Sequence, residues 1–285
     1  MKYGFIKVAS AIPAVKVGDV IFNTQQIEEQ IALAEGKGVE IITFPELSIT
    51  GYSCQDLFRQ QMLLESSEQA VMMLLDFTRK LDIISIVGAP VIAGDLLLNC
   101  GIVIQHGQIL GIVPKTYLPN YGEFYEKRWF SARKYDAVMV NLMNPEDDGD
   151  ELEYNAGSKK AGDRAVGSEV LFGNNVMIEM GSGDQRVKLG IEICEDAWTP
   201  VSPGRLLAMA GAEVILNLSA SNEVIGKAAY RHKLIGSVSS DCLCGYVYVS
   251  AGMYESTSDL VFSGHNLMYE NGKLLGEVKP FEDGV

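Results

Sequence analysis

Positive charge is scarce in this sequence. It has 23 Lys and Arg against 37 Asp and Glu, which gives a formal net charge of −14 at pH 7. The densest basic cluster consists of Lys127, Arg128, Arg133 and Lys134, and it does not extend into a stripe. Because so acidic a chain repels phosphate backbones, we expect no nucleic-acid partner.

The sequence also lacks a disulfide framework, a zinc-ribbon spacing and a membrane segment. Its five cysteines are irregularly spaced, and no apolar run approaches the roughly 20 residues that span a bilayer. Residues 1–10 alternate like a strand rather than resembling a signal peptide. Cys242 and Cys244 have no second cysteine pair nearby, and only His232 lies within a helix length. We expect reduced thiols, no bound metal, no membrane contact and a cytoplasmic location.

Strand and helix patterns alternate along the chain, which indicates an α/β fold. Nearly half of the residues are apolar, 47%, and no internal repeat is present, so one domain spanning residues 1–285 is expected. A polar, acidic stretch at about 141–168 predicts a mobile surface insertion. The chain closes with a predicted hairpin turned at Asn271-Gly272.

The elements that we expect follow from hydrophobic periodicity and turn residues. Strands are predicted at residues 2–9, 39–44, 83–89, 170–180, 185–193, 214–218 and 246–250, with two more within 97–113 that turn at His106-Gly107 and the closing pair at 266–269 and 273–276. Helices are predicted at residues 23–36, opened by an Asn23 cap, and at 56–81, 203–210 and 226–240.

Three reactive side chains each follow an apolar strand directly. They are Glu46, Lys115 and Cys194. Functional sites of α/β proteins gather at strand ends, but each residue alone also has an ordinary interpretation. An isolated Glu or Lys is commonly solvated surface, and an isolated Cys is more often a small buried apolar side chain than a nucleophile.

The residues around these three favour a catalytic role over the ordinary interpretation. Residues 44–47 (FPEL), 114–119 (PKTYLP) and 194–198 (CEDAW) resemble the three signature segments of the nitrilase superfamily of carbon-nitrogen hydrolases. Within it, residues 115–121, 123–126, 128–130 and 217–222 resemble the glutaminase domain of glutamine-dependent NAD synthetase. The resemblance extends from the first strand to the last hairpin.

The resemblance implies a single-domain α-β-β-α sandwich and assigns roles to individual residues. Its catalytic Glu, Lys and Cys correspond to Glu46, Lys115 and Cys194. The substrate-binding positions correspond to Tyr121, Glu126, Glu195, Ser221 and Lys227. No cofactor is expected for the glutaminase reaction. ATP, Mg and deamido-NAD would belong to a synthetase domain, whose Ser-Gly-Gly phosphate-binding loop is absent from these 285 residues.

The resemblance therefore implies hydrolysis of the glutamine side-chain amide through a cysteinyl thioester. The expected partners are L-glutamine and the synthetase domain of a full-length chain, where the ammonia would convert deamido-NAD to NAD; a homo-oligomer is also expected. One alternative is a free-standing amidase or nitrilase that acts on another small amide or nitrile. Another is a catalytically silent module that binds a partner.

Overall fold

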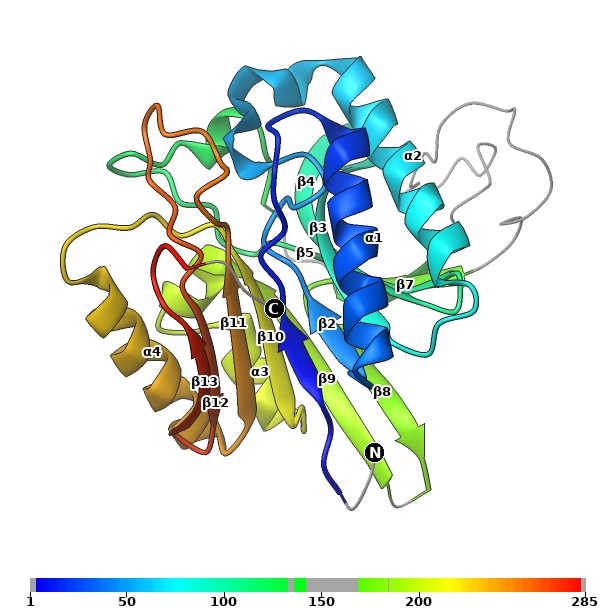
Figure 1. Cartoon of the computed structure of the whole chain (residues 1–285), viewed down its shortest axis with the longest axis vertical. Helices are drawn as coiled ribbons and strands as arrows, with labels where there is room; N and C mark the ends of the chain where they lie inside the picture. The colour runs from blue at the N-terminus through cyan, green and yellow to red at the C-terminus, as the bar shows by residue number, and fades with distance from the viewer. Residues whose placement is uncertain (1–3, 133–135, 142–168, 184, 283–285) are drawn as a thin grey trace.

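Two sheets lie face to face, and helices cover the outer face of each (Figure 1). This computed structural model describes residues 4–132, 136–141, 169–183 and 185–282. The insertion predicted at about 141–168 falls almost entirely outside the described residues. Its mobility and the single-domain boundaries therefore stay predictions.

The first sheet has the strand order β1-β2-β3-β4-β5-β7-β6. Its strands are β1 (Val8–Ser10), β2 (Ile41–Thr43), β3 (Ile84–Ala93), β4 (Leu96–Gln105), β5 (Gln108–Pro114), β6 (Val138–Asn141) and β7 (Glu169–Phe172). β1, β2 and β3 are parallel neighbours, whereas β3, β4 and β5 pair antiparallel. The turn between β4 and β5 lies at His106 and Gly107, both with positive φ, which confirms the hairpin predicted there.

The second sheet has the order β13-β12-β11-β10-β9-β8. Its strands are β8 (Met177–Ser182), β9 (Gln185–Ile193), β10 (Val214–Ser219), β11 (Gly245–Ser250), β12 (Asn266–Glu270) and β13 (Lys273–Val278). β9, β10 and β11 run parallel, so their carboxyl ends meet at one edge. The closing hairpin is confirmed.

Four α-helices among the described residues complete the layers (Figure 1). They are α1 (Val20–Gly36), α2 (Gln61–Thr78), α3 (Pro203–Met209) and α4 (Lys227–Cys242). One apolar cluster packs α1 and α2 on the first sheet, a second fills the space between the sheets, and a third packs α3 and α4 on the second sheet. The α-β-β-α sandwich is therefore confirmed. None of the described helices is both long and apolar enough to cross a membrane.

The start of α1 differs from the prediction. The helix begins at Val20, and the Asp19 carboxylate caps it by accepting from the Phe22 N–H. Asn23 is instead buried inside the first turn, where its amide donates to the carbonyls of Lys16 and Ile49. The Asn23 cap was wrong because this side chain is buried and joins the segment just before the helix, at Lys16, to a distant loop at Ile49.

Other elements also differ from the prediction, and β6 was not predicted at all. The first strand is limited to β1, and the helix predicted at 56–81 is divided into the 3-10 helix η1 (Tyr52–Arg59) and α2. The break lies at Gln60, which has an extended backbone (φ −89°, ψ 119°) between the two helices. Residues 170–180 form two strands in different sheets, β7 and β8, because the chain crosses between the sheets there.

Packing between the sheets should account for much of the stability. Ile191 of β9 is fully buried, and its methyl group packs against Gly101 of β4 in the opposite sheet. We expect Ile191→Ala to lower the free energy of unfolding by about 2–5 kcal/mol. Leu275→Ala, at an exposed site on β13, should change it by less than about 0.5 kcal/mol. Urea denaturation measures both, and equal losses would contradict this account of the core.

Candidate active site

The three reactive residues of the sequence analysis come together at the carboxyl ends of strands from both sheets. Glu46 follows β2 and Lys115 follows β5, both in the first sheet, whereas Cys194 follows β9 in the second. Glu46 and Lys115 are each 1% exposed and Cys194 is 5% exposed. The fold thus brings these three strand ends together, and the site lies where the two sheets meet.

The loop that carries Glu46 crosses β3 at Gly88. A Cβ atom at Gly88 would lie 2.3 Å from the Leu47 nitrogen and 2.6 Å from the Pro45 oxygen. Only glycine allows such a close approach. The Ile49 N–H donates to the Gly88 carbonyl at 3.1 Å, which secures the crossing. Glu46 thus owes its place to a residue 42 positions further along the chain.

Three donors hold the Glu46 carboxylate. Oε1 accepts from Lys115 Nζ at 2.5 Å and from Asn99 Nδ2 at 2.6 Å, and Oε2 accepts from the Ala220 N–H at 3.0 Å. Asn99 also accepts the Lys115 backbone N–H at 2.8 Å through its carbonyl. Because these donors come from both sheets, they fix the direction of the carboxylate as well as its position.

Lys115 lies between two carboxylates. Its Nζ donates to both oxygens of Glu126 at 2.8 Å each, in addition to Glu46. Glu126 also accepts from the Tyr52 hydroxyl at 2.7 Å. Burial by itself lowers the pKa of Lys115, but Glu126 and Glu46 together raise it well above its usual value. Lys115 therefore stays a cation in this site.

Cys194 begins a tight turn with a positive φ of 46°, in the 3-10 helix η3 (Cys194–Trp198). Such a conformation is uncommon for a residue other than glycine and is maintained only where the surroundings impose it. The Asp196 carboxylate accepts from the backbone N–H groups of Ile193 at 3.1 Å and Tyr117 at 2.8 Å. It thereby joins the Cys194 turn to the segment that follows Lys115.

The Cys194 sulfur is held as a thiol. Burial raises the pKa of Cys194, the charge of Glu46 raises it further, and Lys115 only partly opposes them. A thiol is a much weaker nucleophile than a thiolate. Any reaction at this sulfur therefore requires a base that removes its proton, and Glu46 is the carboxylate whose charge acts on it most strongly.

A cavity of about 400 Å³ opens beside Cys194. Its walls combine aromatic rings, two carboxylates, an ammonium group and small polar groups, a mixture that suits a small zwitterionic ligand. Its lining includes Tyr121, Glu123, Phe124, Cys194, Glu195, Trp198, Ser221, Asn222, Lys227 and Tyr230.

Four of the five predicted substrate-binding residues line this cavity. Tyr121 donates its hydroxyl proton to the Glu195 carboxylate at 3.0 Å. The Ser221 hydroxyl is buried and has no hydrogen-bond partner among the described residues, so it is available to a ligand. Lys227 donates to the Asn222 side-chain oxygen, and burial lowers the pKa of its ammonium. The role of these residues in substrate binding stays a prediction.

Glu126 is the fifth predicted residue, and it lies elsewhere. It is not among the residues that line the cavity, and both its oxygens are occupied by Lys115. Its contacts therefore indicate that it orients Lys115 rather than touching a ligand.

Sequence reasoning missed several residues that build the site. Asn99 and Asp196 hold the reactive groups, and Glu123 accepts from Asn222 on the cavity wall. The Trp198 and Tyr230 rings stack at 5.5 Å, with Lys227 Nζ 5.1 Å from the Trp198 centroid. The motifs could have indicated four of these residues, because they contain Asp196, Glu123, Asn222 and Trp198. Asn99 and Tyr230 have no local signal.

Comparison with known proteins agrees with this geometry. The carbon-nitrogen hydrolase family model matches residues 7–285. The chain belongs to the carbon-nitrogen hydrolase family. Because that match covers nearly all of the chain, the superfamily resemblance drawn from the motifs is confirmed.

Within the family, the chain is similar to glutamine-dependent NAD(+) synthetases. A glutamine-dependent NAD(+) synthetase of Mycobacterium tuberculosis is 35% identical over 284 residues, which is 100% of this chain and 38% of the relative. The crystal structure of a glutamine-dependent NAD(+) synthetase from Cytophaga hutchinsonii is 27% identical, with a TM-score of 0.74 over 95% of this chain and 40% of that one. This chain thus spans about two fifths of these relatives.

A third comparison shows the fold alone. A variant of the amidase from Nesterenkonia sp. is 18% identical, with a TM-score of 0.72 over 98% of this chain and 88% of that one. That structure shows covalent addition of the acetamide moiety of fluoroacetamide at the active-site cysteine of the amidase. The α-β-β-α sandwich is therefore shared between the synthetases and an amidase.

The buried Glu126 should make stability depend on pH. Burial raises its pKa to about 7 despite the neighbouring Lys115, whereas a glutamate in an unfolded chain titrates near 4.3. Between these values the folded protein binds more protons than the unfolded chain. This contribution to stability is therefore fully present below the unfolded pKa and is lost as the pH rises through about 7.

Glu126→Gln removes the titrating group and keeps its shape. We expect the free energy of unfolding of this variant, relative to wild type, to rise from about pH 5 to about pH 8, because only the wild type must then ionise a buried carboxyl. Urea denaturation at several pH values across this window gives the difference. A difference that stays constant would show that Glu126 does not titrate there.

Proposed function

We propose that this chain hydrolyses the side-chain amide of L-glutamine to glutamate and ammonia, as the glutaminase part of a glutamine-dependent NAD synthetase. One observation carries the proposal. A buried Glu46–Lys115 pair adjoins Cys194, which faces a cavity lined with charges of both signs. The sequence similarity to glutamine-dependent NAD(+) synthetases supports glutamine as the amide.

The cavity offers groups that match each end of an amino acid. The Lys227 ammonium is a counter-charge for the α-carboxylate, and Glu123 and Glu195 are counter-charges for the α-ammonium. Because the Ser221 hydroxyl lacks a partner within the described structure, it can bond a polar substrate atom. We assign Tyr121 to orienting Glu195, on the basis of their hydrogen bond.

In the first half-reaction, Glu46 removes the thiol proton of Cys194 and the sulfur attacks the amide carbon. A C–S bond forms, and the negative charge that develops on the carbonyl oxygen is stabilised by Lys115 and by the backbone N–H that follows Cys194. Donors of this kind typically contribute about 3–4 kcal/mol. The tetrahedral adduct then breaks its C–N bond, and protonated Glu46 gives its proton to the departing ammonia.

In the second half-reaction, water attacks the thioester carbon. Glu46 removes the water proton, the C–S bond breaks, and the sulfur leaves as Cys194 thiol after it regains a proton from Glu46. Glutamate is released and the site returns to its starting state. One carboxylate can serve twice because its position is fixed by Lys115, Asn99 and the Ala220 N–H.

Glu126 contributes through Lys115. With both its oxygens within 2.8 Å of Nζ, it holds the ammonium in place while Glu46 gains and loses its proton. Lys115 therefore remains charged in both half-reactions.

The ammonia is proposed to pass to a synthetase part outside these residues. The relatives are named for glutamine-dependent NAD(+) synthesis, and this chain matches 38% of the M. tuberculosis protein. ATP, Mg and deamido-NAD would be used in that other part. No residue of the proposed glutaminase mechanism requires them.

Cys194 should be the one thiol that reacts with an electrophilic analogue of glutamine. It adjoins both a carboxylate, Glu46, and an ammonium, Lys115, whereas burial raises the pKa of Cys54, Cys100 and Cys244 with no lysine to oppose it. Intact-mass measurement and peptide mapping locate the adduct, and Cys194→Ala is the control that should remain unlabelled. Labelling of partly exposed Cys242 in place of Cys194 would refute the assignment.

Glu46→Gln should slow acylation of Cys194 by at least about a hundredfold near neutral pH, because the variant must react from the rare spontaneous thiolate. Since the pKa of Cys194 is raised, the residual rate should keep climbing with pH after the wild-type rate has levelled. Single-turnover kinetics at several pH values measure both rates. If the variant acylates as fast as wild type near neutrality, Glu46 is not the base.

A further inference from the structure

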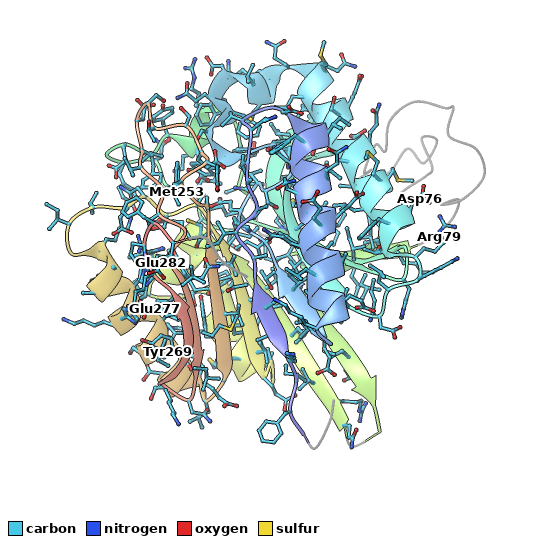
Figure 2. All side chains as sticks on the ribbon, in the orientation of Figure 1. Asp76, Arg79, Met253, Tyr269, Glu277 and Glu282 are labelled. Carbon is cyan, nitrogen blue, oxygen red and sulfur yellow. The ribbon has the colours of Figure 1, made fainter. Side chains whose placement is uncertain are left out.

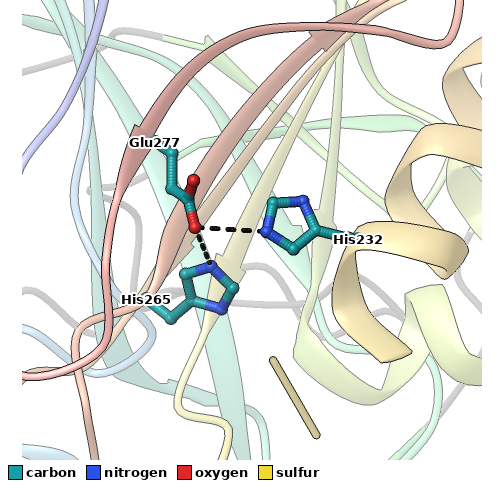
Figure 3. A group of neighbouring side chains, drawn as sticks. All are labelled: His232, His265 and Glu277. Atoms are coloured by element: carbon teal, nitrogen blue, oxygen red, sulfur yellow. Dashed lines mark hydrogen bonds and ion pairs between the residues drawn. The ribbon is translucent and has the colours of Figure 1, made fainter. Parts of the chain in front are cut away.

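A cluster of titratable side chains lies apart from the catalytic trio, between α4 and the closing hairpin. It consists of His232 on α4, His265 just before β12, and Glu277 on β13. Both imidazole rings meet the same carboxylate oxygen, with each Nε2 3.1 Å from Glu277 Oε1 (Figure 3). Figure 2 shows Glu277 and Tyr269 on the hairpin, and the Tyr269 hydroxyl lies 2.7 Å from His232 Nδ1.

The hydrogen bonds determine the tautomer of His265. Arg231 Nη1 lies 2.7 Å from His265 Nδ1, and a guanidinium can only donate. His265 Nδ1 must therefore accept, which places the ring proton on Nε2, from where it is donated to Glu277. Burial, and then the charge of Arg231, lower the pKa of His265, so the ring stays neutral.

This tautomer argues against a metal, although two histidines and a carboxylate are common ligands. Coordination through His265 Nε2 would move the ring proton to Nδ1, where it would face the N–H of Arg231. Metal-bound histidines instead donate their second ring N–H to an acceptor. The arrangement around His265 is therefore built to hold Arg231.

Arg231 connects this cluster to the chain beside the catalytic cavity. Its side chain is fully buried. Nη2 donates to the Asn222 carbonyl at 3.0 Å and to the Glu223 carboxylate at 2.7 Å. The Ser263 hydroxyl donates to the same Glu223 oxygen at 2.6 Å. A buried guanidinium is costly unless its partners are in place, so these contacts restrict where residues 222 and 223 can lie.

Asn222 carries this constraint to the cavity wall. Its side chain lines the cavity, accepts from Lys227 and donates to Glu123. Besides the bond between them, Glu46 and Lys115 are held within the described structure by hydrogen bonds with Asn99, Glu126, Ser219 and Ala220, and none of these involves residues 222–231. The Asn222 part of the cavity wall is thus supported by contacts that the reacting groups do not share.

We propose that Arg231, held by neutral His265, is a positioning residue that sets the affinity of the cavity for the amino-acid end of the substrate. This rests on the proposed glutaminase function. When the acceptor at His265 Nδ1 is lost, Arg231 keeps its charge but loses a buried partner, and the Asn222 segment is no longer fixed. Substrate binding weakens while the chemical step proceeds as before.

Two isosteric variants isolate the contact. In His265→Asn the amide oxygen can occupy the position of Nδ1 and accept from Arg231, whereas in His265→Gln the amide group lies near Nε2 and that acceptor is lost. We expect His265→Gln to raise KM for glutamine about tenfold and to change kcat by less than about threefold. His265→Asn should stay within about twofold of wild type in KM.

His106 is exposed at the turn between β4 and β5, where its ring bonds the Asp82 carboxylate. His106→Asn is therefore the control, and it should leave KM and kcat unchanged. If the two His265 variants raise KM equally, or if kcat falls as much as kcat/KM, the positioning role is refuted. Stoichiometric Zn²⁺ binding that is lost in His232→Gln would also refute it, because the cluster would then be a metal site.

A second measurement separates this proposal from the proposed function. Alkylation of Cys194 by iodoacetamide, which lacks an amino-acid end, should proceed equally in wild type and His265→Gln. Saturable labelling by an electrophilic glutamine analogue should require about tenfold more reagent in the variant. If wild type shows no saturation with the analogue, glutamine recognition itself fails. If both proteins saturate at the same concentration, only the positioning role fails.

Discussion

Lys115 lies between Glu46 and Glu126 with almost no access to solvent, and the rest of the site depends on that ion cluster. Burying an ammonium and two carboxylates is costly unless each remaining polar atom is satisfied. Asn99, Tyr52 and the Ala220 N–H satisfy these atoms. Burial, and then the charge of Glu46, explain why the pKa of Glu126 rises although a lysine lies beside it.

The cluster also explains why a cysteine with a raised pKa suits this chemistry. A permanent thiolate beside two carboxylates would add a third buried anion, so the sulfur holds its proton until a substrate arrives. Glu46 is already oriented to remove that proton, since its donors fix it from both sheets. The proposed reaction therefore moves a proton within the site without adding to its buried charge.

The cavity wall follows a different constraint. Its Asn222 segment is supported by α4 and the closing hairpin through Arg231 and His265, whereas the reacting groups are supported by the Cys194 turn and by donors from both sheets. Two supports of this kind allow substrate affinity and chemical rate to respond separately to substitution. Glu126, which the resemblance places among the substrate-binding residues, belongs to the support of the reacting groups, because it bonds Lys115.

Local pattern determined most of the order of strands and helices, the closing hairpin and the three strand ends that carry Glu46, Lys115 and Cys194, because periodicity and motifs are properties of neighbouring residues. It missed β6 and did not separate β7 from β8. It did not determine the cap of α1, since Asn23 is drawn inside by a contact with Ile49 in a distant loop. It also did not reveal Asn99 or Arg231. Their roles exist only once the chain has folded and brought residues such as Glu46 and Lys115, 69 positions apart, into contact. Tertiary packing alone decided these contacts, because buried charges select their partners by distance in space and not along the chain.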